Sequence, residues 1–531
     1  MKRTLIIAAL AVFCAAETFA QSAIDAYNIS PTELRGTARF VSMGGAFTSL
    51  GGDISCMTQN PAGLGIYRSS DIGLTFDLTM RSYKSATNYR NDKNSETSFK
   101  FDNFGYVGVV NLKGAMSTFQ WGISANRTAS IDRLSSGYIL PTKSSLSNYI
   151  ASYTNGVDSY DILHDDSYNP FYDSSEDWLS ILAYNSFLIN NTSSDTEYAG
   201  LYNNGTKGDA MFKIRERGYS YEYNIDFAGN VSDIFFWGAG VGITDLEYTR
   251  ENDYSESMEN ALVYNTENDV LMPGNAGFGL YNYQHISGTG ANLKFGVIVR
   301  PIEMLRIGVA IHTPTWLHLL HTGYGDVDYS FTAADGTTNS GKYGTPDYNE
   351  YTSKLNSPWR FMLGASTVIG TKAIISADYE LVAYNNMTLK QQNYDRFGGY
   401  IDNTYANQDV KEYFKGANIF RIGAEYRLLP ELSLRAGYNW QGSAVKESAK
   451  RNTTIYTSGT DPSYTFYNDT HNISVGVGYR YRSWYIDAAY QYVTQSGIYH
   501  AYTPFAGCSD TPSANITNTY NNIVLSTGFR F

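Results

Sequence analysis

The sequence predicts an all-β fold: a 14-stranded antiparallel transmembrane β-barrel with an N-terminal plug (hatch) segment. Three observations predict it: an export signal at the start, a recurring pair of strands joined by a short turn, and a final strand that ends on Phe531. The composition agrees, with 46 Tyr, 26 Phe, 48 Gly and only 17% charged residues. The mean hydropathy of -0.32 is expected where lipid-facing and lumen-facing residues alternate.

Residues 1–20 have the layout of a secretory signal peptide. Lys2 and Arg3 precede an apolar run from Leu5 to Ala16, and Thr18-Phe19-Ala20 forms a small-x-small cleavage pattern. The run is shorter than the ~20 residues that a spanning helix needs, so we expect cleavage before Gln21 rather than an anchor. No later segment is apolar over ~20 residues either, so any membrane crossing must use strands.

The main organisational signal is a pair of alternating strands that recurs six times, with a short turn inside each pair and a longer polar loop after it. The predicted turns are Lys113–Met116, Ser232–Ile234, Pro301–Met304, Gly370–Ala373, Leu429–Glu431 and Tyr481–Trp484. Each turn has strands of ~10 residues on both sides, enough to cross a bilayer at a tilt. One further strand at each end, 71–82 and 520–531, gives fourteen.

Alternation within these strands predicts which face meets lipid. In 419–428, Phe420 and Ile422 share a face with other apolar residues, whereas Arg421 and Glu425 lie on the opposite face. A soluble β-sandwich also alternates, but with its charges outward. Charges in mid-strand, aromatic residues at strand ends and a chain that ends on a strand favour the membrane.

The last strand also resembles an assembly signal. Phe529 and Phe531 fall on one face with other apolar residues, which resembles the C-terminal pattern by which barrels reach the barrel-assembly machinery. An even number of strands places both termini and all short turns in the periplasm and the long loops outside.

Several function classes are excluded by composition. A net charge of -12 and a pI of about 5.1 argue against nucleic-acid binding. Cys56 and Cys508, which remain after signal cleavage, form no disulfide framework or metal cluster. The seven histidines stand apart and none belongs to a catalytic triad, so we expect no enzyme, no metal and no cofactor.

Two outer loops carry apolar residues. The largest, about 132–217, contains apolar residues at near-helical spacing, and the loop at 314–323 contains a similar cluster. Each cluster is either a helix that caps the barrel mouth, which we favour, or an apolar surface that captures a ligand. The residues proposed for capture are Trp178, Leu182, Trp316, Leu317 and Leu320.

Charged residues on the lumen side of the strands form another candidate group. Their main expected role is structural, since pairs across the lumen would hold the wall and the plug together, although an arginine is also able to bind a carboxylate head group. These residues are Arg306, Arg360, Asp378, Glu380, Arg421, Glu425, Arg435 and Arg480.

About fifty mature residues, 21–70, precede the first strand at 71 and have no place in the wall. They include Gly44-Gly45-Ala46-Phe47 and, later, Asn60-Pro61-Ala62-Gly63-Leu64. Pro61 fixes its own φ and restricts Asn60, and Gly63 permits a tight return. These motifs resemble the FadL-type (FadL/TodX) outer-membrane transporters, in which a plug carrying an Asn-Pro-Ala-Gly-Leu motif fills a fourteen-stranded barrel; the chain looks like a Bacteroidetes-like member.

The resemblance implies passive uptake of long-chain fatty acids or other hydrophobic small molecules across the outer membrane of a Gram-negative bacterium. It also implies that the ligand leaves sideways through a gap between strands. The expected partners are outer-membrane lipid, lipopolysaccharide, the ligand and, during assembly, the barrel-assembly machinery. The protein itself is expected to be a monomer. Two alternatives are an attachment barrel of a protein-secretion system and a general diffusion porin. Copurified secretion components would indicate the attachment barrel, and high single-channel conductance would indicate the porin.

Overall fold

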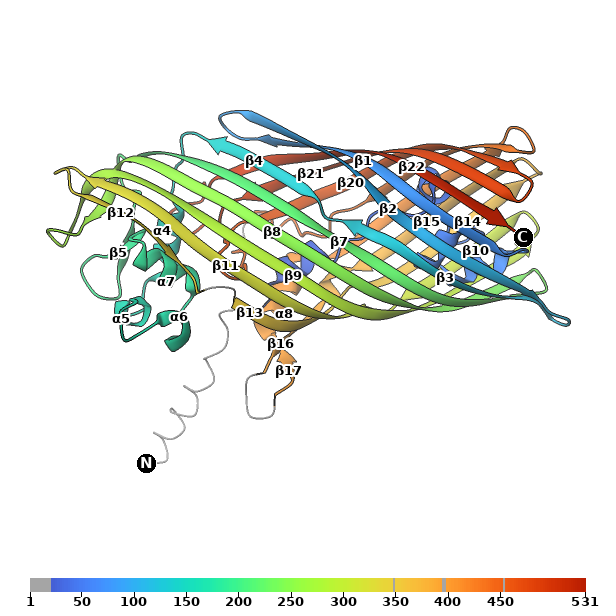
Figure 1. Ribbon diagram of the computed structural model, residues 1–531, viewed down its shortest axis with the longest axis horizontal. Helices are drawn as coiled ribbons and strands as arrows, with labels where there is room; N and C mark the ends of the chain where they lie inside the picture. The colour runs from blue at the N-terminus through green and yellow to red at the C-terminus, as the bar shows by residue number, and fades with distance from the viewer. Residues whose placement is uncertain (1–20, 347–348, 394–397, 452–453) are drawn as a thin grey trace, which may run out of the picture.

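The computed structural model describes residues 21–346, 349–393, 398–451 and 454–531; the predicted signal peptide lies outside them. Twenty strands form one antiparallel sheet. The sheet closes into a barrel because β1 (Asp71–Ala86) pairs with β2 (Asn91–Asn111) on one side and with β22 (Ser513–Arg530) on the other (Figure 1).

The described strands make fourteen wall positions, as predicted. Ten positions are single strands: β1, β2, β7 (Lys207–Val231), β8 (Phe235–Asn265), β9 (Val270–Ile302), β18 (Gly416–Arg427), β19 (Leu432–Gln441), β20 (Tyr464–Tyr481), β21 (Trp484–His500) and β22. Four positions are interrupted strands: β3 (Met116–Ser130) with β4 (Arg133–Ile139), β10 (Leu305–His312) with β11 (Trp316–Ala333), β14 (Trp359–Ile369) with β13 (Asn349–Asn356), and β15 (Ala373–Ala383) with β16 (Thr388–Gln392). Pro314 and Pro358 lie at two of the interruptions, where a residue without an N–H interrupts the ladder.

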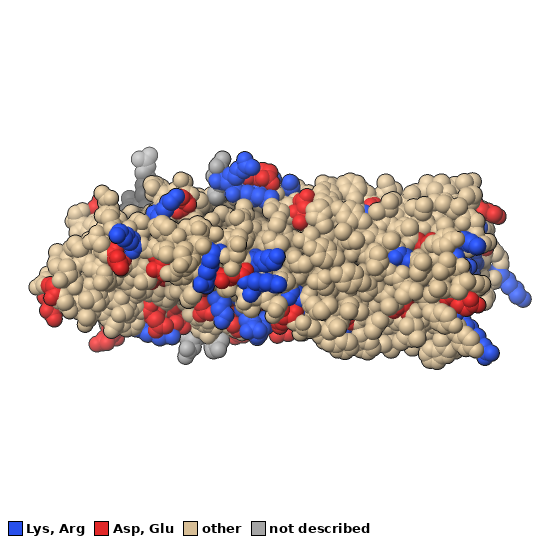
Figure 2. All heavy atoms as spheres, turned by 90° about the horizontal axis from the view of Figure 1, so that it is seen from above, with Lys and Arg blue, Asp and Glu red and all other residues tan. Residues whose placement is uncertain are grey.

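The six predicted turns are confirmed, and they all lie at one end of the barrel, with the C-terminus (Figure 1). The predicted lipid face is exposed on the outer wall: Phe420 and Ile422 are each 51% exposed. Figure 2 shows a largely uncharged band on the outer surface next to the turn end, with many charges farther along the barrel. This band is the expected hydrocarbon-facing belt.

Several strands continue well beyond the belt. β8 and β9 have 31 and 33 residues, far more than the ~10 that cross a bilayer. The prediction of a loop over 132–217 was therefore too wide, because β4 and β7 occupy its two ends, and the loop predicted at 314–323 is wrong. Trp316 begins β11, which pairs with β9 from Trp316 opposite Ala291 onward.

The remaining insertion, residues 140–206, forms a cap at the end opposite the turns. It contains α4 (Leu146–Thr154), α5 (Ser159–Ile162), α6 (Pro170–Asp173), α7 (Trp178–Asn185) and the β5–β6 pair (Ile189–Asn191, Tyr198–Gly200). Its apolar side chains pack against the extended parts of the wall, so the favoured reading of a helical cap describes this segment. Two hairpin extensions, β12 (Thr338–Gly344) and β17 (Tyr400–Asp402), complete the sheet.

Residues 21–70, the plug, lie inside the barrel (Figure 1). They contain α2 (Ala23–Ile29), α3 (Ala38–Ser42) and the short helices η1 (Ile54–Thr58) and η2 (Pro61–Ile66). α2 packs near α8 (Thr404–Tyr413) and the short helix η3 (Tyr384–Asn386) in an internal apolar core. Among the described residues, no helix is both long and apolar enough to span a membrane.

Candidate functional site

The plug is seated against glycines of the barrel wall. Ten of the fourteen wall positions present a glycine whose added Cβ would lie within 3.0 Å of a plug atom. They are Gly73, Gly105, Gly122, Gly238, Gly296, Gly308, Gly364, Gly423, Gly437 and Gly476. Because the glycines lack side chains, the wall and the plug backbone approach closely around most of the circumference.

The predicted plug motif, Asn60 to Leu64, lies in this seat. Asn60 is fully buried and caps η2, since its Oδ1 accepts from the Ala62 N–H at 3.0 Å while its Nδ2 donates to the Thr48 carbonyl at 2.6 Å. The backbone of Pro61 and Ala62 packs on Gly238 of β8. The motif therefore joins two parts of the plug to each other and to the wall.

Several predicted lumen charges connect the wall to the plug. Glu425 accepts from Arg39 of the plug at 2.9 Å and from Arg435 at 2.6 Å. The Asp378 carboxylate accepts the Thr48 N–H of the plug at 2.8 Å, and the Arg306 guanidinium donates to the Leu50 carbonyl at 2.8 Å.

The other predicted lumen charges lie within the wall. Glu380 pairs with Arg360 at 2.6 Å and with Arg421 at 2.5 Å, so these three close a network above the plug. Arg480 is exposed toward the turn end of the lumen, where it lines a basin. The eight residues therefore divide into plug contacts, a wall network and one solvent-facing arginine.

The backbone ladder is incomplete between β2 and β3. β2 pairs with β3 only from Asn103 opposite Asn126 toward the turn, and β4 pairs with β7 instead. Residues 91–102 of β2 therefore have no described backbone pairing on that side, although β1 covers their other side. Phe99 on the unpaired stretch is 68% exposed on the outer wall, so the unpaired region begins beside apolar surface.

Side chains bridge the two edges of this unpaired region. Arg127 of β3 donates to Asp102 of β2 at 2.7 Å, and Lys100 of β2 donates to Ser130 at 3.0 Å. Tyr221 of β7 reaches the Phe101 carbonyl at 2.9 Å. The region is closed in this structure, but by contacts that a change of rotamer would release.

A short plug segment, Pro31–Arg35, lies along the same region, and we call it the strap. The Glu33 N–H donates to the Thr128 carbonyl of β3 at 2.8 Å, and Arg35 pairs with Asp102 of β2 at 3.3 Å and with Asp77 of the adjacent β1 at 2.8 Å. The strap therefore contacts both edges of the unpaired region. A cavity of about 1220 Å³ borders it on the lumen side and extends to Pro358.

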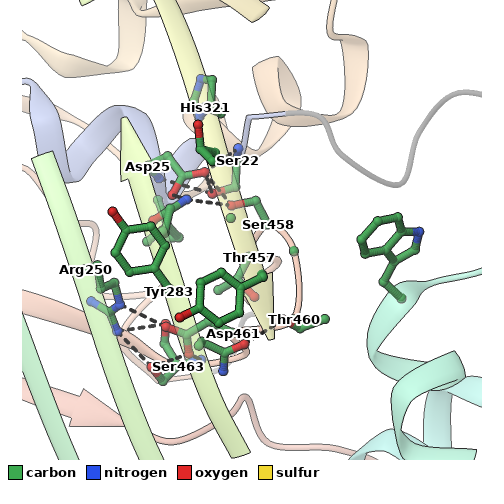
Figure 3. A pocket seen from close by; sticks show the side chains of 18 of the residues that line it. Ser22, Asp25, Arg250, Tyr283, His321, Thr457, Ser458, Thr460, Asp461 and Ser463 are labelled. Carbon is green, nitrogen blue, oxygen red and sulfur yellow. Dashed lines mark hydrogen bonds and ion pairs between the residues drawn. The ribbon is translucent and has the colours of Figure 1, made fainter. Parts of the chain in front are cut away.

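A second cavity, of about 750 Å³, lies between α2, β9, β11 and the loop at 457–463, and Trp178 of the cap also lines it. Figure 3 shows the Tyr283 ring between two polar groups. One group is Asp25, which accepts from Gln284 at 3.0 Å and Ser458 at 2.6 Å. α2 lines this cavity and leads into the strap, so one continuous segment borders both cavities.

The second polar group in this cavity is built on the ion pair between Arg250 and Asp461, at 2.9 Å. Arg250 also donates to the Ser463 hydroxyl at 2.8 Å, and Glu216 approaches it at 3.4 Å. The cation is thus matched by carboxylates, and Asp25 adds a further negative charge to the lining. Trp178, Tyr283, Tyr324 and Tyr351 add aromatic surface between these polar groups, so the cavity is able to hold an uncharged molecule with an apolar body.

The structure separates the five residues predicted for ligand capture. Trp178 lines the second cavity and Leu317 lines the cavity beside the strap. Leu182 is fully buried in the core of the cap. Trp316 and Leu320 are 46% and 37% exposed on the opposite face of β11 from Leu317, so they point away from the lumen.

Sequence reasoning missed the strap, the unpaired stretch of β2 and the aromatic lining of the second cavity. Tyr283, Tyr324 and Tyr351 had a signal in the high tyrosine content, but that content does not distinguish a cavity lining from the aromatic residues expected at strand ends. Nothing in the sequence near Glu33 distinguishes the strap from an ordinary polar loop. Among the described residues, no group of three or more metal-ligating side chains is present.

Comparisons with known proteins bear on the fold. No family model matches the chain, and no curated protein matches it in sequence. Among solved structures, a FadL homologue of Pseudomonas aeruginosa is 13% identical with a TM-score of 0.51, covering 95% of this chain and 99% of that chain. The Pseudomonas putida toluene transporter TodX is 14% identical with a TM-score of 0.48, covering 94% and 99%. The fold is that of the FadL-type barrels, as the resemblance implied.

Proposed function

We propose that this protein resides in the outer membrane and takes up a hydrophobic small molecule passively, releasing it sideways between β2 and β3. The observation that carries the proposal is the unpaired stretch of β2, 91–102, beside the strap and an internal cavity. A hydrophobic molecule that leaves where this stretch begins, beside the exposed Phe99, enters the outer edge of the belt without crossing the periplasmic end. The turn end would face the periplasm and the cap would face outward.

The plug supports a sideways exit over an axial one. It contacts wall glycines around most of the circumference, and Asp378, Glu425 and Arg306 bind it through hydrogen bonds or ion pairs. Moving it axially would break these contacts together, whereas opening between β2 and β3 requires only side chains and the strap to move. A plug held in this way also argues against an open diffusion porin.

The second cavity favours an uncharged ligand over a fatty acid. A carboxylate placed near Asp25 would meet a negative charge, and Arg250 already has carboxylate partners. We therefore rank neutral aromatic or aliphatic compounds above fatty acids. TodX, a structural neighbour, is described as a toluene transporter.

Cross-linking tests the route. A thiol-reactive linker about as long as a lysine side chain should join Lys100→Cys to Ser130→Cys across the unpaired region, because the Lys100 Nζ reaches the Ser130 hydroxyl at 3.0 Å. Uptake of labelled toluene and palmitate by cells that express the protein should then fall, and a cleavable linker should restore it. The matched control joins His318→Cys and Thr289→Cys, which are opposite on a fully paired seam.

Uptake that survives the first cross-link would exclude this route. Mass spectrometry of the protein purified in mild detergent tests the ligand class, since the proposal expects a neutral hydrophobic compound. Recovery of secretion components without any bound small molecule would favour an attachment role instead.

A further inference from the structure

The turn end of the lumen contains an open basin of about 1740 Å³ beneath the plug. Plug residues 50–52 and 66–69 form its inner wall, and the ends of the wall strands surround it. Figure 2 shows Lys and Arg side chains at this end of the molecule. The orientation proposed above opens the basin to the periplasm, and the inference rests on that orientation.

The basin is strongly basic in a chain whose net charge is -12. Its acidic lining residues are Glu425, Glu431 and Asp487. Its arginines are Arg39, Arg68, Arg306, Arg427, Arg435, Arg480, Arg482 and Arg530.

Half of these arginines have carboxylate partners. Arg39 and Arg435 pair with Glu425, and Arg530 and Arg68 pair with Asp71 and Asp233 at 3.0 and 2.5 Å. Across the described ranges, no carboxylate lies within 4.0 Å of the side-chain nitrogens of the other four, Arg306, Arg427, Arg480 and Arg482. Four guanidinium groups therefore lack an ionic partner.

The spacing of these four arginines sets the size of a matching anion. They come from β10, β18, β20 and the turn after β20, and five strand-to-strand steps separate β10 from β20. At ~4.8 Å per step this is an arc of roughly 24 Å. One small anion cannot reach across it, whereas an extended peptide of about seven residues can.

We propose that this basin binds an extended acidic segment of a periplasmic protein. Each guanidinium is able to hold a carboxylate with two parallel hydrogen bonds. Lipid head groups do not enter the basin, because it lies inside the barrel and the lipid lies outside; only Arg482, at the rim, packs over the outward-facing Tyr481 ring. A segment bound there contacts Leu50 and Gly51 directly, and Arg39 donates to the neighbouring Gly52 carbonyl at 3.1 Å. The partner would therefore lie against the plug.

Peptide binding to the purified full chain tests the proposal. The probe is a fluorescent peptide of about ten residues that alternates Glu and Gly, long enough to span the arc, and its match has Gln in place of Glu. Fluorescence anisotropy should show that the Glu peptide binds at least ~10-fold more tightly and that added salt weakens it. This comparison uses the unaltered protein, so it does not depend on the folding of a variant.

Variants localise the binding. Replacing Arg427, Arg480 and Arg482 with Gln should weaken the Glu peptide at least ~10-fold. The control replaces Lys213, Arg215 and Arg217 with Gln on the part of β7 beyond the belt and should leave binding unchanged. Equal binding of both peptides, or an equal loss in the control, would overturn the proposal.

Two further measurements separate alternatives. Displacement of the peptide by inorganic phosphate at a matched concentration would indicate a small-anion site and count against an acidic segment. Uptake of toluene is also measured on the unaltered protein, so failure of the Glu peptide to bind that protein, with intact uptake, refutes this inference alone.

Discussion

The side-chain amide of Asn60 donates to the main-chain carbonyl of Thr48 at 2.6 Å, inside the barrel. Thr48 itself lies against Gly308 of β10 and Gly364 of β14, and Asn60 lies against Gly296 of the adjacent strand β9. This hydrogen bond therefore ties together two plug segments that the wall positions separately. It explains why the motif needs an amide, which donates to one backbone group and accepts from another.

Asn60→Ala should loosen the plug while the barrel still assembles. The substitution leaves the Thr48 carbonyl and the Ala62 N–H without their partner in a buried site, which costs about 1–3 kcal/mol for each group. Hydrogen exchange should become faster in residues 48–62, and toluene uptake should fall. Thr58→Ala, at a partly exposed neighbour, is the control; unchanged exchange in Asn60→Ala would show that the bond does not hold the plug.

Gly238→Ala should disturb the plug from the wall side. The added methyl group overlaps the backbone of Pro61 and Ala62, and backbone has little freedom to move away. Small polar solutes should then enter liposomes that contain the protein faster than with the unaltered chain. Gly277→Ala on β9 is the matched control, because its nearest new neighbour is 3.9 Å away. Equal permeability of the two variants would contradict a close seat at Gly238.

Glu256 should make the stability of the cap depend on pH. Burial raises the pKa of this carboxyl to about 7, although Tyr254 and the Leu146 N–H donate to its Oε1 at 2.6 and 2.9 Å. Its ordinary pKa is 4.5, so the folded cap binds the proton more tightly than the unfolded chain does. The free energy of unfolding therefore falls as pH rises from about 4.5 to about 7 and is level above that.

Glu256→Gln should remove this loss of cap stability with rising pH. Thermal denaturation of the cap is followed by tryptophan fluorescence. Above pH ~7 the variant should have a higher Tm than the unaltered protein. At a pH near 4.5, the ordinary pKa of the carboxyl group, the two proteins should have similar Tm values. Glu259→Gln, an exposed position on the same strand, should keep the original pH dependence. A Tm that rises with pH in the unaltered protein would reverse the sign and refute the assignment.

The wall of the barrel was predictable because its period-two pattern is local. Phe420 and Arg421 identify their own faces whatever the rest of the chain does. From Trp316 to Leu320 the alternation does not identify the faces. Leu317 and Leu319 on the inner face are as apolar as Trp316 and Leu320 on the outer face. A shift of one residue would exchange the two faces, so the sequence cannot assign them. The strap was not predictable, since Glu33 and Arg35 acquire their role only through strands far away in sequence.

Trp178→Ala should weaken ligand binding by roughly tenfold, the usual loss when an aromatic anchor that buries a ligand is removed. Trp178 lines the second cavity, but it also packs on Phe171 in the cap, with ring centroids 4.8 Å apart. Leu182→Ala separates these roles, because Leu182 is buried in the same core without lining the cavity. Toluene binding, measured by calorimetry, should fall in the first variant only. Equal losses in both would mean that cap stability, and not ligand contact, is what Trp178 supplies.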